Sequence, residues 1–363
     1  MSYSRKKILV TQSGADTSSV LLIYTGGTVG MGHDQEGSLI PFDFSMVLDH
    51  IPSLRAFDLT LSVVAIDEPI DSSNVNPAHW RLLGQIIHEN YEEFDAFVVL
   101  HGTDTMAYTA SAMSFVLRGL NKPVIFTGAQ LPISAIRSDA RENILTAIDL
   151  ASATIEGEPI VPEVCIYFNN FLLRGNRSKK VESNHFDAFE SENYPALAEA
   201  GISIDYNHSY IRKVNRDSEL QLHTEFDRNV AILKLFPGIC KAVVNSILSI
   251  KGLKGVVIET FGAGNAPTES WFLDCVRNAV ERGLIVLNVS QCMGGQVVQG
   301  KYETSQHLEK IGVLSGWDIT TESAVTKMMH LLGSEQNNEI VKQRIVKPIC
   351  GEMSVNVEFG DEV

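Results

Sequence analysis

The sequence predicts an α/β protein with a larger N-terminal domain, built on a mainly parallel sheet, and a smaller C-terminal α/β domain. Short apolar runs rich in β-branched residues alternate with runs of helical length and period. The alternation weakens between residues 183 and 228 and then resumes. A chain of 363 residues is long enough for two domains of ordinary size.

The N-terminal pattern predicts a flavodoxin- or Rossmann-like sheet. The expected strands are apolar at consecutive positions, as buried parallel strands are, and span residues 20–24, 97–101, 123–128 and 164–168. Helical periodicity between them predicts helices over 105–120 and 138–153, the second with Ser138 or Asp139 as its N-cap. Strand–helix–strand alternation of this kind places helices on both faces of the sheet.

The same alternation returns in the C-terminal part. The expected strands span 230–236, 255–261 and 284–292. The expected helices span 241–250, 268–283 (with Gly283 at its C-terminal end), 304–311, 320–332 and 338–346. We therefore divide the chain into an N-terminal arm (1–19), an N-terminal domain (20–204), a linker (205–228) and a C-terminal domain (229–363).

Charge and composition exclude several classes of function. The formal net charge of −15 argues against nucleic-acid binding, which needs a basic face, and against attraction to an anionic membrane. Five widely spaced cysteines without a C-x-x-C pair indicate reduced thiols in the cytoplasm rather than disulfides or a metal site. Only three apolar residues follow the basic start of the chain, so no signal peptide is expected, and no run is long enough to span a membrane.

Polar clusters follow several predicted strands, where α/β sheets bind ligands. The first, "YTGGTVG" after strand 20–24, lacks the spacing of a dinucleotide fingerprint and the lysine of a P-loop. Its glycines permit positive φ and the close approach of a substrate, so that Thr25 or Thr28 could present a hydroxyl. A tight turn whose threonines bond only to backbone is the alternative.

The second cluster, "HGTDT", places Thr103 and Asp104 at the start of a helix. Threonine is a common N-cap and aspartate suits a helix N-terminus, so a structural role is an open alternative. A threonine nucleophile needs a base, and a partly desolvated lysine from "GNRSKK" (175–180) could supply it if that basic cluster is not simply a solvated loop. Asp71, Ser72 and Ser73 form a further cluster, suited to an amino and a carboxylate group or to a turn.

Taken together, these motifs resemble the bacterial type I (cytoplasmic) L-asparaginases. The resemblance runs from about residue 20 to 350 and rests on "YTGGTVGM", "DSSNVNPAHW", "FVVLHGTDTMAYTASAMSF", "KPVIFTGAQLPI", "RSDARENI", "FNNFLLRGNRSKK", "FGAGNAP" and "LNVSQCMGGQV". It implies hydrolysis of L-asparagine to L-aspartate and ammonia without a cofactor or metal. It also implies self-association as a homodimer or a homotetramer, a dimer of dimers.

The resemblance assigns roles by motif. The nucleophile falls on Thr28, and the second catalytic threonine on Thr103, supported by Asp104 and Lys180. Substrate-binding roles for the α-amino and α-carboxylate groups fall on a second set: Asp71, Ser72, Ser73 and, contributed by a neighbouring subunit, Asn265.

Two departures from the family pattern matter. Bacterial relatives usually carry a tyrosine shortly after the glycine pair, whereas this chain has "HDQEGSLIP" there. Tyr302 is our candidate replacement, with a domain-interface tyrosine as the alternative. Type I enzymes can also bind effector asparagine through an arginine and a threonine at positions that here hold Glu259 and Lys179. The reversed charge at the first position predicts little or no asparagine cooperativity.

Two other functions remain as alternatives. One is the glutaminase-type subunit of a tRNA-dependent amidotransferase, which carries an additional N-terminal module that the nineteen residues before the first strand are too few to form. The other is a non-catalytic amino-acid sensor, which would not need Thr28, Thr103, Asp104 and Lys180 together. The sequence does not determine the preference for asparagine over glutamine, since one methylene changes binding by only about 1–3 kcal/mol.

Overall fold

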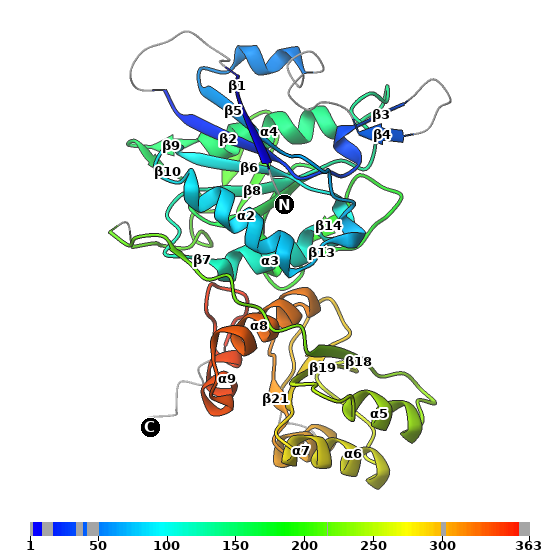
Figure 1. Cartoon of the computed structure of the whole chain (residues 1–363). Helices are drawn as coiled ribbons and strands as arrows, with labels where there is room; N and C mark the ends of the chain where they lie inside the picture. Colours follow the sequence, from blue (N-terminus) through cyan, green and yellow to red (C-terminus); the bar gives the residue numbers. More distant parts are fainter. Residues whose placement is uncertain are drawn as a thin grey trace. The chain divides into compact units, whose positions relative to one another are not determined.

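The computed structural model describes residues 3–8, 17–33, 39–41, 51–215, 217–298 and 303–355. The chain divides into two compact units, Met1–Thr224 and Glu225–Val363 (Figure 1).

The N-terminal unit is built on a nine-stranded sheet in the order β1-β5-β2-β6-β8-β11-β12-β15-β16. Neighbouring strands from β5 to β11 are parallel, whereas β1 and the strands after β11 are antiparallel. The strands are β1 (Tyr3–Ile8), β5 (Thr60–Ile66), β2 (Ser19–Tyr24), β6 (Ala96–Leu100), β8 (Val124–Thr127), β11 (Val164–Phe168), β12 (Phe171–Arg174), β15 (Ala198–Ala200) and β16 (Ile204–Tyr206).

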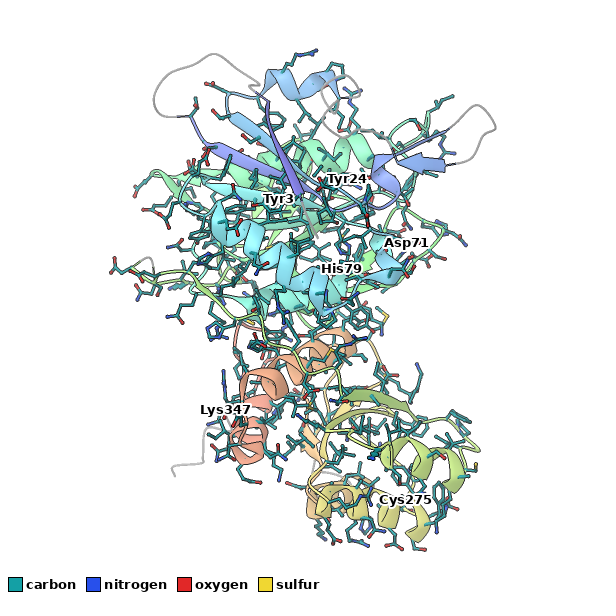
Figure 2. The ribbon with its side chains drawn as sticks, in the orientation of Figure 1. Tyr3, Tyr24, Asp71, His79, Cys275 and Lys347 are labelled. Carbon is teal, nitrogen blue, oxygen red and sulfur yellow. The ribbon has the colours of Figure 1, made fainter. Side chains whose placement is uncertain are left out.

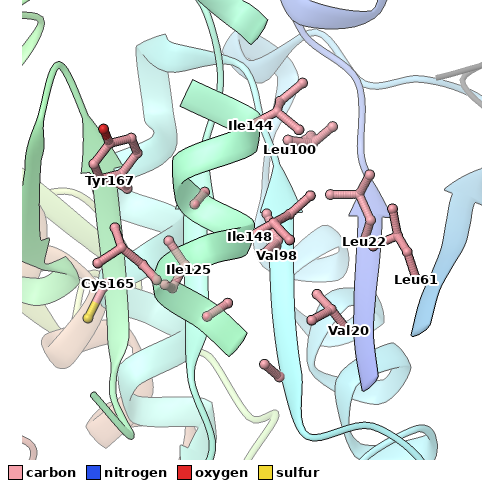
Figure 3. Close-up of a cluster of buried hydrophobic side chains, with 14 of the residues drawn as sticks. Val20, Leu22, Leu61, Val98, Leu100, Ile125, Ile144, Ile148, Cys165 and Tyr167 are labelled. Carbon is pink, nitrogen blue, oxygen red and sulfur yellow. The ribbon is translucent and has the colours of Figure 1, made fainter. Parts of the chain in front are cut away.

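Helices cover both faces of this sheet. Successive residues of a strand point to opposite faces, so Val98 and Leu100 of β6 share one face with Leu22 of β2. Figure 3 shows Ile144 and Ile148 of α4 (Ala140–Ser152) lying against this face, in a single cluster of buried residues. The helices α2 (Pro77–Glu89) and α3 (Met106–Val116) pack against each other on the other side of the sheet (Figure 1). The α/β class and the four predicted parallel strands are confirmed.

Short elements complete the N-terminal unit. Four pairs are small antiparallel ladders: β3 (Met31–His33) with β4 (Leu39–Pro41), β7 (Leu117–Arg118) with β17 (Gln221–Leu222), β9 (Thr154–Ile155) with β10 (Glu158–Pro159), and β13 (Lys179–Lys180) with β14 (Phe189–Glu190). Single 3₁₀ turns are η1 (Thr28–Gly30), η3 (Pro52–Ala56), η4 (Ser72–Asn74), η5 (Thr103–Thr105) and η6 (Gly175–Arg177).

One local prediction was wrong, and another was correct for Ser138 but not for Asp139. The helix expected to reach residue 120 ends at Val116, because the next two residues pair with β17. Asp139 sits at the N-cap position of α4 but does not cap it. Its carboxylate accepts hydrogen bonds from the N–H groups of Gln130 and Leu131 instead, and the Ser138 hydroxyl accepts from the Ala140 N–H.

The C-terminal unit is a four-stranded parallel sheet, β18-β19-β20-β21, with helices around it. Its strands are β18 (Val230–Lys234), β19 (Gly255–Thr260), β20 (Ile285–Ser290) and β21 (Leu314–Ser315). Its helices are α5 (Lys241–Leu248), α6 (Ser270–Glu281), α7 (Glu303–Lys310), α8 (Thr321–Ser334) and α9 (Asn338–Ile345). Each predicted strand and helix of this part is present; the three strands, α5, α6 and α9 are one to four residues shorter than expected, whereas α7 and α8 are not.

The predicted domain boundaries at residues 19, 204 and 228 stay predictions. Strand β1 lies inside the expected N-terminal arm, and β16 crosses the boundary expected at residue 204. In the described ranges, no helix has both the length and the apolar character needed to cross a membrane.

Candidate active site

Three loops meet at the carboxyl ends of β5, β2 and β6. These strands are neighbours and parallel, so the loops that follow them lie at one edge of the sheet. Hydrogen bonds join the loops directly, because the Thr25 N–H donates to the Leu100 carbonyl (3.0 Å) and the Ile70 N–H donates to the Thr25 carbonyl (2.8 Å). Three separate parts of the chain therefore form one polar rim.

Glycines allow these loops to touch. A Cβ on Gly27 would lie 2.6 Å from both Cα and N of Gly102, and a Cβ on Gly102 would lie 2.6 Å from the Ser72 hydroxyl oxygen. Gly26 and Gly27 also have φ of +125° and +87°, which disfavours any other residue. Since Thr28 follows Gly27 directly, this contact places it beside the turn that carries Thr103.

The two threonines of "TGGT" have different environments. Thr25 is buried, and its hydroxyl donates to the Leu100 carbonyl at 2.9 Å. Thr28 is half-buried at the start of η1. Among the described residues, the Thr28 hydroxyl, unlike that of Thr25, makes no hydrogen bond to the sheet.

Asp71 and Ser73 form a small polar group in the second loop (Figure 2 labels Asp71). The N–H and the hydroxyl of Ser73 each donate to Asp71 Oδ1 at 2.9 Å. Both hydrogen bonds lower the pKa of Asp71, and the bond from the N–H has the larger effect. The exposed carboxylate is therefore ionised at neutral pH. Ser72 is buried, and its carbonyl accepts from the Thr105 hydroxyl at 2.7 Å.

Lys180 joins Thr103 and Asp104 in the third loop. Its Nζ donates to the Thr103 hydroxyl oxygen and to Asp104 Oδ1, both at 2.7 Å. The Lys180 side chain is 18% exposed, whereas that of Asp104 is 65% exposed. The predicted trio is therefore assembled, with the amine largely withdrawn from water and in contact with a hydroxyl. An amine in such a place is suited to proton transfer.

Lys180 reaches this position from the β13–β14 ladder, where it pairs with Phe189. Phe189 is buried against Phe168, the last residue of β11, with ring centroids 5.2 Å apart. The ladder is thus attached to the sheet by an aromatic contact. This explains how Lys180, at the end of a basic segment whose residues 175–178 are buried, is held over the rim.

The chain before the ladder is anchored by a buried ion pair. The Arg174 side chain donates to Glu163 through Nε (2.6 Å) and Nη2 (3.1 Å), and both side chains are almost fully buried. Arg174 also donates to the Tyr210 carbonyl at 3.0 Å, and the Arg212 N–H donates to the same Glu163 carboxylate. The segment leading to Lys180 is consequently fixed to the chain near residue 210.

Gln130 is a site residue that our sequence analysis did not single out. The Thr103 hydroxyl donates to Gln130 Oε1 at 3.2 Å, and Gln130 Nε2 donates to the His185 carbonyl at 3.1 Å. Asp139 holds the backbone of Gln130. Its place in "GAQLP", directly after a predicted strand, was the available signal.

The roles expected for Asn265 and Tyr302 stay predictions. Asn265 lies in the C-terminal unit, in a turn after β19 where its N–H donates to the Phe261 carbonyl at 2.8 Å. Tyr302 lies outside the described residues. In the same unit, the Glu259 carboxylate accepts from the Thr321 hydroxyl (2.6 Å) and lies 3.5 Å from Lys234 Nζ.

Within the described part of the chain, no group of three or more histidine, cysteine, aspartate and glutamate side chains is placed to bind a metal ion. The groups that the structure brings to the rim are hydroxyls, carboxylates, an amine, the Gln130 amide and backbone N–H groups.

Comparisons with known proteins found two matching family models and several similar proteins. A family model described as "Asparaginase, N-terminal" matches residues 19–212, and one described as "Glutaminase/Asparaginase C-terminal domain" matches residues 229–344. L-asparaginase 1 of Escherichia coli K12 is 37% identical over 344 residues, which cover 93% of this chain and 98% of that protein. The crystal structure of L-asparaginase I from Vibrio cholerae superposes with a TM-score of 0.85 at 37% identity and covers 93% of this chain and 100% of its own.

A longer relative is also similar. The human protein named 60 kDa lysophospholipase is 38% identical over 361 residues, covering 92% of this chain. The chain spans only 61% of that protein's length.

Proposed function

Because the chain belongs to the asparaginase family, we propose that it is an amidohydrolase that converts L-asparagine to L-aspartate and ammonia. The observation that carries the proposal is the contact of Lys180 Nζ with both Thr103 and Asp104 at 2.7 Å, beside the loop of Thr28. Relatives named L-asparaginase support the substrate.

In the proposed reaction, the Thr28 hydroxyl attacks the side-chain amide carbon of the substrate. The relay of Thr103, Lys180 and Asp104 accepts the hydroxyl proton and returns it to the departing nitrogen, so that ammonia leaves and a β-aspartyl ester forms on Thr28. Water then hydrolyses the ester. Backbone N–H groups near Gly27 or after Gly102 stabilise the oxyanion of each tetrahedral intermediate.

Asp71, Ser72 and Ser73 are proposed to bind the substrate's α-groups. The ionised Asp71 carboxylate suits the α-ammonium group, and its two hydrogen bonds from Ser73 keep it oriented before substrate arrives. Asn265 of a neighbouring subunit is proposed to complete the site in a homodimer or homotetramer. Tyr302 remains our candidate for the missing loop tyrosine, and the cytoplasm our proposed location.

Ammonia release tests this function. The wild type is assayed with L-asparagine, L-glutamine and D-asparagine over a range of concentrations, in parallel with Thr28→Ala. We expect turnover of L-asparagine that Thr28→Ala abolishes.

The alternatives give different results. An amino-acid sensor would bind L-asparagine in calorimetry without releasing ammonia. An amidotransferase subunit would release ammonia from L-glutamine, and only with its partner subunit and tRNA present. Full activity of Thr28→Ala would reject Thr28 as the nucleophile.

A further inference from the structure

His101 lies between the sheet and the candidate site, and the proposed reaction gives it no role. The residue is 3% exposed, and Nδ1 is 2.7 Å from the carbonyl oxygen of Gly102. A carbonyl oxygen can only accept, so Nδ1 carries the hydrogen and donates it. The ring of Phe126 packs edge-on against His101 at a centroid distance of 6.1 Å.

The backbone of His101 is held closely on both sides. Its backbone N–H donates to the Thr127 carbonyl at 2.9 Å, and a Cβ on Gly128 would lie 2.4 Å from the His101 carbonyl oxygen. Burial lowers the pKa of His101 to about 4; the hydrogen bond to the Gly102 carbonyl opposes this shift, and the interaction with His79 adds to it. The ring is therefore neutral at neutral pH, with its single hydrogen on Nδ1.

The hydrogen bond from His101 Nδ1 to the Gly102 carbonyl restrains the peptide that joins Gly102 to Thr103. A peptide unit is planar and trans, so the Gly102 carbonyl and the Thr103 N–H point in opposite directions. Gly102 is the N-cap residue of η5, and its carbonyl also begins the helical hydrogen bonds that continue into α3. No described residue accepts a hydrogen bond from the Thr103 N–H. Fixing the carbonyl on one side therefore aims this N–H to the other side.

We propose that His101 is a positioning residue, whose Nδ1–H bond to the Gly102 carbonyl orients the Gly102–Thr103 peptide so that the Thr103 N–H stabilises the substrate oxyanion. The proposal rests on the amidohydrolase function proposed above. The close contacts of Gly102 with Gly27 and Ser72 give it weight, because a rotation of this peptide would disturb all three loops. A purely structural role would be to fill the space beside Phe126.

The variants His101→Asn and His101→Leu separate the two roles. Asn places a side-chain N–H near the position of Nδ1, whereas Leu has a similar size and no donor. A structural role predicts that Leu is the better replacement, since Asn buries an amide oxygen that needs a partner. A positioning role predicts the opposite order for kcat.

We expect kcat of the Leu variant to be about five- to tenfold below that of the Asn variant, with KM changed less than threefold, although Leu has the higher Tm. Hydrogen–deuterium exchange of peptides covering residues 101–105 provides a readout that does not need turnover. Exchange at Thr105, at the end of the 3₁₀ turn that the Gly102 carbonyl opens, should be faster in the Leu variant.

The outcomes are distinct. If the variant with the higher Tm also has the higher kcat, and exchange is equal in both variants, the positioning role is wrong. An inactive wild type overturns the amidohydrolase function, and the exchange measurement then still decides whether His101 orients this peptide.

Discussion

The contact between Gly27 and Gly102 makes a quantitative prediction for Gly27→Ala. At a φ of +87°, any other residue costs about 1–2 kcal/mol. The new Cβ would also lie 2.6 Å from two backbone atoms of Gly102, where ordinary contacts begin at about 3.4 Å. Backbone cannot rotate away as a side chain can, so the loops must separate by most of an ångström.

A displacement of this size next to Thr28 and Thr103 should lower kcat about 100-fold, since misplacing reacting groups by 1 Å has an effect of that order. Gly157→Ala is the matched control, because Gly157 has a φ of +81° in the same unit and a Cβ added to it would meet nothing within 4 Å. The control carries the conformational cost alone, so it should lose about 1 kcal/mol of stability and retain its activity.

Ammonia release and chemical denaturation are measured for both variants. Wild-type kcat in Gly27→Ala would refute the view that close loop packing sets the geometry of the site. An equal loss of kcat in Gly157→Ala would attribute the effect to stability alone.

The remaining predictions concern single groups. Thr103→Val should lower kcat about 10²–10⁴-fold with little change in Tm, and full activity would remove Thr103 from the relay. Asp71→Asn should raise KM for L-asparagine about 10–100-fold, because the α-ammonium loses an ionic partner; an unchanged KM would place the ammonium elsewhere. Burial lowers the pKa of His101 from 6.5 to about 4, so in this range the unfolded chain binds a proton that the folded protein does not. The free energy of unfolding should therefore fall by up to about 3 kcal/mol between pH 6.5 and pH 4, and this part of the fall should be absent in His101→Leu denaturation curves. With Glu259 and Lys179 at the effector positions, the velocity curve for L-asparagine should be hyperbolic, and a sigmoidal curve would contradict this.

The sequence predicted those parts of the fold that depend on local patterns. Continuous apolar runs such as 97–101 identify buried parallel strands, and polar residues directly after them identify the binding edge. The helix at 106–116 was predicted too long, because its end is set by pairing with residues 221–222, about a hundred positions away. No window of local sequence contains that information.

In the candidate site, too, local sequence predicted some residues, whereas others depend on contacts between distant parts of the chain. Thr103 and Asp104 could be located from a strand followed by a helix start. The role of Asp139 could not, because a carboxylate before a helix usually caps it, whereas here it holds the backbone of Gln130. Gln130 becomes relevant only when the loop after β8 is seen beside Thr103.

The position of Lys180 on a separate two-residue ladder has a consequence for folding. Its two contacts join residues 77 and 76 positions apart, and the ladder is attached to β11 by the contact of Phe189 with Phe168. Contacts so distant along the chain form late, since they close long loops. During refolding, enzymatic activity should therefore return after the helical circular-dichroism signal, because the N-terminal unit must be complete before Lys180 reaches Thr103 and Asp104.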